Sequence, residues 1–233
     1  MIIVKRCFGG FDPFTYLAAN LYAAYWPDDP AWTNPGNGGA IVTARDGSGN
    51  GRDIVAGGDG ATFTANALNG RAGFTFGGTN GRLRGSEAGW GNLAQPFTII
   101  GVVLSLTTND TGWSSDTSSA GKQMLYRYQA LGNYQLFAGW SVSTANGLSA
   151  TAHVARCVVN GASSELQVYN LASTVTGNAG AGTCAGFRLG YTYAGTSPLS
   201  GSLGFVGVYS AAVSSASAAD LVAALGSWYG IAT

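Results

Sequence analysis

The sequence predicts an all-β domain: an antiparallel β-sandwich or barrel with one amphipathic helix at its C-terminal end. Short apolar runs recur along the chain with turn residues between them, which is typical of sandwiches and barrels. The run Phe97–Leu106 alternates with a period of two and places Ile100, Val102, Leu104 and Leu106 on one face of a strand. Only the last segment changes to a helical period, and the length of 233 residues suits one domain.

The first 60 residues carry the weakest secondary-structure signals. Residues 2–4 predict a short strand, whereas Thr15–Ala24 is compatible with a strand or a short helix. Pro27–Gly60 is rich in proline and glycine and predicts a loop. We expect residues 1–19 to form an N-terminal docking arm and residues 20–233 to form one domain, because no linker divides the rest of the chain.

Strand signals become regular from Phe74 onward. Asn160-Gly161 lies between two alternating runs and is a strong hairpin signal, because both residue types accept the positive φ of tight hairpin turns. The predicted strands are Phe74–Phe76, Phe97–Leu106, Met124–Tyr128, Tyr134–Trp140, Ala150–Val159, Glu165–Asn170, Phe187–Tyr191 and Leu203–Ser210.

The last segment predicts a single helix of about three turns that lies on the sandwich. Ser214 or Ser215 can cap its N-terminus, because a serine hydroxyl accepts from the first free backbone N–H groups. Leu221, Leu225 and Trp228 recur at i, i+4 and i+7 and form one apolar stripe.

Composition excludes several classes of protein. Eleven basic and eleven acidic residues give a net charge of zero, and only 9% of residues are charged, so we expect no nucleic-acid partner. No apolar run reaches the length of a membrane helix, and no signal peptide is recognised, so synthesis in the cytoplasm without membrane insertion is expected. Cys7, Cys157 and Cys184 lack CxxC spacing and are interpreted as free thiols.

A series of motifs, in their order, resembles a known family. These motifs are Ala24-Tyr25-Trp26-Pro27-Asp28-Asp29, Asp46-Gly47-Ser48-Gly49-Asn50-Gly51-Arg52-Asp53-Ile54, Phe74-Thr75-Phe76-Gly77-Gly78-Thr79-Asn80-Gly81-Arg82-Leu83, Pro96-Phe97-Thr98-Ile99-Ile100, Leu203-Gly204-Phe205-Val206-Gly207-Val208-Tyr209 and Trp228-Tyr229-Gly230-Ile231. Over about residues 20–232 the chain resembles a concanavalin A-like (LamG-type) jelly roll, in the single-domain form common in bacteriophage virion proteins. The resemblance implies a two-sheet antiparallel jelly-roll sandwich, with a concave face that binds sugar in lectins and laminarinases.

Catalytic chemistry is not expected from the residues present. A glycosidase needs two carboxylates that flank one bond, and relatives with laminarinase activity carry Glu-x-Asp-x-x-Glu on one strand. The two glutamates here, Glu87 and Glu165, have no second acid two or three residues away. His153, the only histidine, is interpreted as a sheet-face residue rather than a base or ligand. The chain is therefore predicted to be no enzyme and to need no cofactor.

The acidic residues outside these positions are assigned to turns rather than to a metal site. Asp28 and Asp29 form one cluster, and Asp46 with Asp53 forms another. Both lie in turn-rich loops, where aspartate normally accepts hydrogen bonds from its own backbone. No metal site is expected, because calcium needs six to eight oxygen ligands.

Exposed aromatics beside polar groups are the remaining signal, because sugar rings stack on aromatic faces while their hydroxyls form hydrogen bonds. Trp26, Trp228 and Tyr229 are assigned to the core. Packing within the loop layer or against a neighbouring subunit is the alternative interpretation of the others. Four aromatics in or near glycine-rich or polar loops are expected to be partly exposed and are the candidate glycan-binding residues: Trp90, Trp113, Tyr191 and Tyr193.

The leading functional hypothesis is a non-enzymatic bacteriophage virion protein, either a minor tail protein or a capsid decoration protein. Its weakly charged surface suits contacts with other virion proteins in a symmetric oligomer, because charge is depleted at interface cores. The alternative is a lectin-like module that binds cell-envelope polysaccharide, and a glycoside hydrolase using Glu87 or Glu165 is a third possibility. The aromatics expected to dock the arm on a neighbour are Phe8, Phe11, Phe14, Tyr16 and Trp32.

Overall fold

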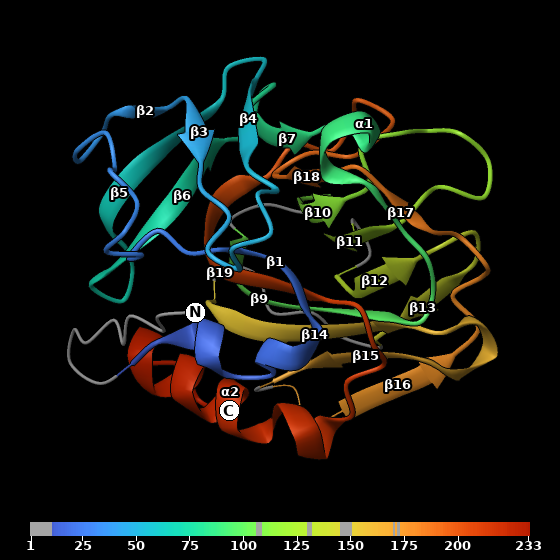
Figure 1. Cartoon of the computed structure of the whole chain (residues 1–233). Coiled ribbons are helices and arrows are strands. Elements are labelled where there is room, and N and C mark those ends of the chain that lie inside the picture. The colour runs from blue at the N-terminus through green and yellow to red at the C-terminus, as the bar shows by residue number, and fades with distance from the viewer. Residues whose placement is uncertain (1–10, 106–108, 130–131, 145–150, 170, 172) are drawn as a thin grey trace.

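Two antiparallel β-sheets pack face to face, and a C-terminal helix lies against the outer side of one of them (Figure 1). The computed structural model describes residues 11–105, 109–129, 132–144, 151–169, 171 and 173–233. Within these residues the predicted all-β sandwich with one C-terminal helix is confirmed. No helix among them is long and apolar enough to cross a membrane.

The sheet beneath the helix, which we call sheet A, has the strand order β16-β15-β14-β9-β19-β6-β5-β2, and β1 also pairs with β19. Its strands are β1 (Leu21–Tyr25), β2 (Ala40–Ile41), β5 (Ala61–Leu68), β6 (Arg71–Gly77), β9 (Phe97–Ser105), β14 (His153–Val159), β15 (Ser164–Val168), β16 (Ser173–Gly177) and β19 (Ser200–Tyr209). The hairpin predicted at Asn160-Gly161 joins β14 to β15 through a 3-10 turn, η3 (Gly161–Ser163).

The second sheet, which we call sheet B, has the order β13-β12-β11-β10-β18-β7-β4-β3. Its strands are β3 (Thr43–Ala44), β4 (Ile54–Gly57), β7 (Arg82–Gly85), β10 (Thr111–Ser114), β11 (Leu125–Tyr128), β12 (Tyr134–Phe137), β13 (Ser141–Ser143) and β18 (Phe187–Leu189). Two short strands, β8 (Asn92–Leu93) and β17 (Cys184–Ala185), pair with each other beside a one-turn helix, α1 (Glu87–Trp90).

Strand β9, which contains most of the longest apolar run, is apolar on both of its faces. Ile99 and Val103 point into the core between the two sheets. Ile100 and Val102 point the other way, into a second apolar cluster beneath the C-terminal helix. Since both faces of this strand are covered, its residues are apolar at successive positions.

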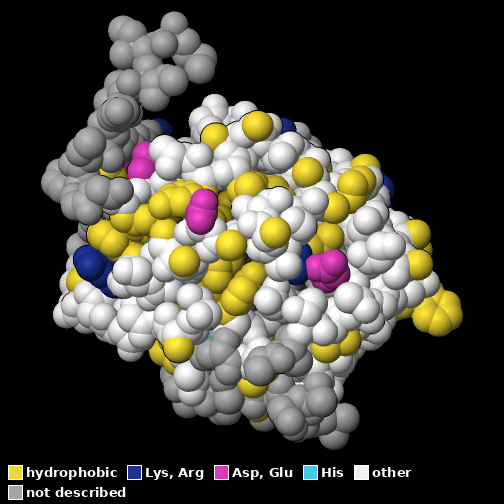
Figure 2. Space-filling view, turned by 90° about the horizontal axis from the view of Figure 1, so that it is seen from below, with side chains coloured by type: hydrophobic (Ala, Val, Ile, Leu, Met, Phe, Trp, Pro, Cys, Tyr) yellow, Lys and Arg dark blue, Asp and Glu magenta, His cyan; other side chains and the backbone are white. Residues whose placement is uncertain are grey.

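The C-terminal helix α2 (Ser215–Tyr229) covers the outer side of sheet A. The hydroxyl of Ser214 accepts a hydrogen bond from the backbone N–H of Ser217 at 3.1 Å, so Ser214 is the N-cap. Leu221 and Leu225 of the predicted stripe are buried, and Trp228 is partly buried beside them. Figure 2 shows this side of the molecule, where hydrophobic side chains gather across the middle and charged ones are few.

The described N-terminal aromatics Phe11, Phe14 and Tyr16 pack on the rest of the chain. The ambiguous stretch forms two 3-10 turns, η1 (Pro13–Thr15) and η2 (Ala18–Asn20), and then strand β1. The ring of Phe11 lies 5.6 Å from that of Trp26 and 5.1 Å from that of Trp228. Phe14 and Tyr16 also pack on the cluster beneath α2. Part of their apolar surface is therefore buried within the chain, and their docking on a neighbour stays a prediction.

Trp32 is likewise intramolecular. Its ring packs edge-on against Phe63 and Phe74, and its indole N–H donates to the carbonyl of Thr43 at 3.0 Å. Phe8, the fifth of the predicted docking aromatics, lies outside the described residues. Trp32 therefore packs, partly buried, against the core between the sheets.

Several strands were missed because their sequences carry little periodic signal. The predicted loop Pro27–Gly60 contains β2, β3 and β4, each of two to four residues. The segment Thr111–Ser114, expected to be a polar loop, is the buried strand β10. Cys157 and Cys184 are buried and unpaired, and burial raises the pKa of both thiols. Cys7 lies outside the described residues.

Candidate functional site

The two outer sides of the sandwich differ in chemistry. Sheet A presents apolar residues to α2, whereas the outward positions of sheet B are largely polar. In β7 Leu83 is buried between Arg82 and Arg84, and in β18 Arg188 lies between two buried residues. In β11 Arg127 likewise alternates with buried neighbours. Because side chains of a strand point alternately to its two faces, these arginines all lie on the outer side of sheet B.

A pocket of about 250 Å³ opens on this outer side. Arg127 and Gln135 form part of its lining on β11 and β12, and Ser141 contributes from β13. Thr192 and Tyr193 line it from the loop that follows β18. The pocket therefore combines a guanidinium, an amide, hydroxyls and an aromatic ring on the polar side of the sandwich.

The loop that carries Tyr193 is held by hydrogen bonds on both sides of it. The hydroxyl of Thr192 donates to the carbonyl of Thr196 at 2.6 Å and accepts from the Thr196 N–H at 2.9 Å. The hydroxyl of Ser114 on β10 donates to the carbonyl of Tyr191 at 2.9 Å. These contacts close a short turn and tie it to sheet B, so the ring of Tyr193 is presented on a fixed backbone.

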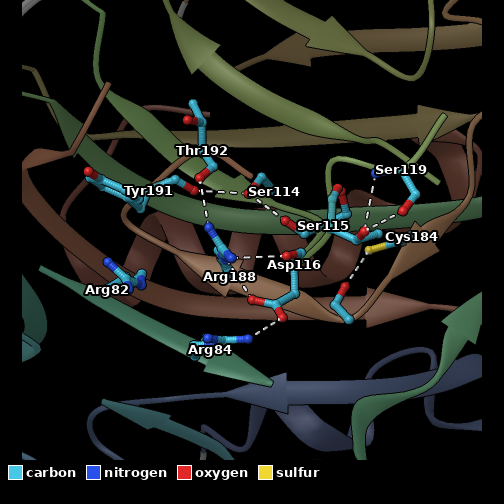
Figure 3. Close-up of polar contacts among 12 residues, drawn as sticks. Arg82, Arg84, Ser114, Ser115, Asp116, Ser119, Cys184, Arg188, Tyr191 and Thr192 are labelled. Atoms are coloured by element: carbon cyan, nitrogen blue, oxygen red, sulfur yellow. Dashed lines mark hydrogen bonds and ion pairs between the residues drawn. The ribbon is translucent and has the colours of Figure 1, made fainter. Parts of the chain in front are cut away.

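An ion-paired cluster beside the pocket fixes the same loop (Figure 3). Arg188 donates from Nε to Oδ1 of Asp116 at 2.6 Å, and Arg84 donates from Nη2 to Oδ2 of the same carboxylate at 2.7 Å. The other side of the Arg188 guanidinium donates from Nη1 to the carbonyl of Thr192 at 3.0 Å. The side chain of Asp116 is only 8% exposed, so solvent screens these pairs weakly.

Arg127 is held in the pocket lining by an amide instead of an acid. Its Nε donates to Oε1 of Gln135 at 2.8 Å, and Nε2 of Gln135 donates to the hydroxyl of Ser141 at 2.8 Å. Partial burial raises the pKa of the Tyr193 phenol, and the nearby charge of Arg127 opposes this rise. The guanidinium of Arg127 and the phenol of Tyr193 are thus close enough to act on one ligand.

Two of the predicted glycan-binding aromatics are on this face and two are not. Tyr191 and Tyr193 are partly exposed, as expected, and Arg82 lies over the ring of Tyr191 at 5.4 Å. The expectation for Trp90 and Trp113 is corrected, because they are only 1% and 0% exposed.

The packing of each tryptophan explains its burial. Trp90 stacks on Phe187 at 5.1 Å and donates its indole N–H to the hydroxyl of Tyr25. Trp113 stacks on Tyr126 at 4.5 Å between the two sheets. Large aromatic rings gain most from burial, and both rings are already covered by other rings of the chain.

Arg127 and Gln135 were missed by the sequence analysis, although a signal for them was present. Both lie on strands that were predicted, and both alternate there with residues that are buried. Period-two alternation identifies them as outward-facing, but their place beside Tyr193 depends on how β18 and its following loop pair with the sheet.

The candidate acids and the histidine lie apart from this pocket. Glu87 pairs with Lys122 at 2.5 Å beside α1, and Glu165 pairs with the buried Arg156 at 2.5 Å on sheet A. The structure therefore does not bring the two glutamates into one site. His153 is completely buried on the inner side of β14.

Asp29 and Asp46 accept hydrogen bonds within turns, as predicted, whereas Asp28 accepts from the indole N–H of Trp228. Asp46 accepts hydrogen bonds from the backbone N–H groups of Ala24 and Ser48. Asp29 accepts one from the N–H of Ala31. Within the described ranges, no group of three or more histidine, cysteine, aspartate or glutamate residues is placed to hold a metal ion.

No family model matches the sequence, and no curated protein matches it either. Solved structures share the fold. Trypanosoma rangeli sialidase in complex with sialic acid aligns with a TM-score of 0.59 and 15% identity, over 90% of this chain and 33% of that one. A structure of T. rangeli sialidase gives a TM-score of 0.60 at 12% identity. This chain thus spans about a third of the length of the sialidase.

An isolated domain also aligns over nearly its whole length. Domain 4 of AbnA, a GH43 extracellular arabinanase from Geobacillus stearothermophilus, in complex with arabinotriose, gives a TM-score of 0.55 at 14% identity. The alignment covers 87% of this chain and 98% of that domain. At these identities the likeness shows the β-sandwich fold and assigns no reaction.

The comparisons contradict the prediction that the chain is not an enzyme. The solved structures named above belong to enzymes, a sialidase and an arabinanase. The scarcity of paired carboxylates in the sequence was therefore an insufficient reason to exclude catalysis.

Proposed function

We propose that the chain is a glycan-binding module and that its binding site is the pocket beside Tyr193 on sheet B. The observation that carries this proposal is a partly exposed tyrosine ring on a braced loop, next to the guanidinium of Arg127 and the amide of Gln135. A sugar ring presents an apolar face that stacks on an aromatic ring, and its hydroxyls pair with such polar groups.

The comparisons support this reading over a role in virion assembly. The arabinanase domain of similar fold was solved with arabinotriose, and the sialidase with sialic acid. None of the solved structures named above is a virion protein. The predicted virion location and the symmetric assembly with other virion proteins have no support from these comparisons.

A glycan array followed by calorimetric titration tests the proposal. We expect binding in the micromolar to millimolar range, and Tyr193→Ala should weaken it about fivefold, because one stacked ring contributes roughly 1 kcal/mol. Tyr169→Ala removes a partly buried tyrosine from the other sheet and is the matched control. Binding that survives Tyr193→Ala unchanged, or no binding to any glycan on the array, would contradict the proposal.

Cleavage is measured in the same samples, because the structures of similar fold belong to enzymes. Reducing sugar released by the wild-type chain and lost in Tyr193→Ala would add catalysis to binding at this pocket. Glu87→Gln and Glu165→Gln test the two glutamates, which lie at separate places in the fold.

A further inference from the structure

The strands of sheet B carry four arginines and no acidic residue. Arg82 and Arg84 lie on β7, Arg127 lies on β11 and Arg188 lies on β18. Their buried neighbours in the strands face the core, so all four side chains belong to the outer side. The chain as a whole has eleven basic and eleven acidic residues. A protein without net charge thus concentrates positive charge on one face, which attracts anionic ligands.

Two of these arginines share one carboxylate of the protein itself. Asp116 gives one carboxylate oxygen to Arg188 and the other to Arg84. That carboxylate is nearly buried, so a ligand does not compete easily for its partners. The pair is thus a brace for the loop that carries Tyr193.

Arg127 has no such acidic partner in the described part of the chain. Nε of Arg127 donates to Gln135. The two terminal nitrogens of Arg127 donate no hydrogen bond to any described residue. They belong to a side chain that lines the pocket, next to Tyr193. A guanidinium held by one edge and open at the other is arranged to bind a planar anion with two parallel hydrogen bonds.

We propose that the pocket selects acidic glycans and that Arg127 binds the carboxylate of a carboxylated sugar. The inference rests on the proposed glycan-binding function and names its ligand class. Gln135 orients the guanidinium, while the ring of Tyr193 packs against the apolar face of the same sugar. Carboxylate is the group that fits best, because it is planar and matches the guanidinium edge.

Carboxylated ligands and neutral comparison ligands test this selection. The full chain is titrated with trigalacturonate and its methyl ester, and with sialyllactose, sulfolactose and lactose. We expect at least one carboxylated probe to bind, and its neutral counterpart to bind about tenfold to a hundredfold more weakly, as for loss of a charged hydrogen bond. Added salt should weaken the carboxylated probe and leave the neutral one unchanged.

Arg127→Gln should weaken the carboxylated probe by the same factor and the neutral probe by much less, because only the carboxylated probe loses a charged hydrogen bond. Arg127→Lys keeps the charge but loses the planar edge. Its affinity for the carboxylated probe should fall between those of the wild type and Arg127→Gln. The control is Arg71→Gln, which removes an arginine that lies over Trp228 on the side of α2. Circular dichroism and thermal unfolding of each variant verify that the fold is kept.

The possible outcomes separate this inference from the proposed function. If neutral and carboxylated probes bind equally, and Tyr193→Ala still weakens both, the module binds glycans and the acidic selection is wrong. If sulfolactose binds as tightly as sialyllactose, the site is a general anion site and the carboxylate assignment fails. If no probe and no glycan on the array binds, the proposed function itself fails.

Discussion

Arg188 and Asp116 are joined by two hydrogen bonds, from Nε to Oδ1 at 2.6 Å and from Nη2 to the Asp116 carbonyl at 2.9 Å. The same guanidinium reaches the carbonyl of Thr192, next to the ring that lines the pocket. One aspartate therefore sets the position of a strand residue and, through it, of the candidate binding loop. Stability and ligand affinity are linked at this pair.

Asp116→Asn should lower the free energy of unfolding by about 2–3 kcal/mol, because it leaves the guanidiniums of Arg188 and Arg84 without their carboxylate. Urea denaturation measures the loss. The control is Asp59→Asn, which changes an exposed carboxylate that accepts from Thr79 and should shift stability by less than about 0.5 kcal/mol. Equal effects of the two variants would show that the brace adds little.

Acid should destabilise the fold through His153. Burial lowers the pKa of His153 from 6.5 to about 4, so below pH 6.5 the unfolded chain binds a proton that the folded chain does not bind. The stability contributed by the neutral ring is present above pH 6.5 and is lost as the pH falls toward 4. The loss is about 3 kcal/mol for this group.

Denaturation curves at a series of pH values measure this dependence. The imidazole is set between the hydroxyls of Tyr126 and Tyr134, at 2.9 Å and 3.3 Å, and His153→Gln replaces it with a polar group that does not titrate. The variant should be less stable at neutral pH and should lose less stability between pH 6.5 and 4. If the unfolding free energy of the wild type and that of the variant changed equally with pH, the lowered pKa of His153 would be contradicted.

Gly101→Ala should destabilise the sandwich by about 1–3 kcal/mol through overpacking. A methyl group at Gly101, in the middle of β9, would lie 2.7 Å from Cζ3 of the buried Trp113. Gly77→Ala in β6 is the matched control, because nothing lies within 4 Å of its methyl position. Thermal unfolding distinguishes them, and a Gly101 variant as stable as the control would show that the Trp113 ring has room to move.

Ser214→Ala should cost about 1 kcal/mol by leaving the N–H of Ser217 without its cap. Ser215→Ala tests the other serine that the sequence allowed as a cap. Ser215 is exposed within the first turn, so its substitution should change the unfolding free energy by less than about 0.5 kcal/mol. If Ser215→Ala lowered the unfolding free energy more than Ser214→Ala in urea denaturation, Ser215 would be the N-cap and the helix would begin one residue later.

The sequence was most informative where the signal is local. The alternation of Phe97–Leu106, the Asn160-Gly161 turn and the stripe of Leu221 and Leu225 depend on neighbours within a few residues, and each predicted element is present in the fold. Strands β3 and β4 of sheet B were missed, because two to four residues do not establish a period.

Local sequence did not determine which aromatics are exposed. Trp113 lies in a polar stretch, and Tyr193 precedes a glycine-containing loop, so the two looked alike. Trp113 is buried because β10 pairs between β11 and β18, which turns its side chain toward the core. Tyr193 is partly exposed because its loop is held over the outer side of the same sheet.

By itself, the sequence determined that this chain forms an antiparallel all-β fold with a terminal helix, since hydrophobic period and turn residues are set by consecutive positions. Only the tertiary structure decided where a ligand fits. The pocket joins Arg127 to Tyr193, which are 66 residues apart, and the loop with Tyr193 is braced by Asp116 from a third segment. Such a site arises from strand pairing between distant segments, and no local pattern encodes that pairing.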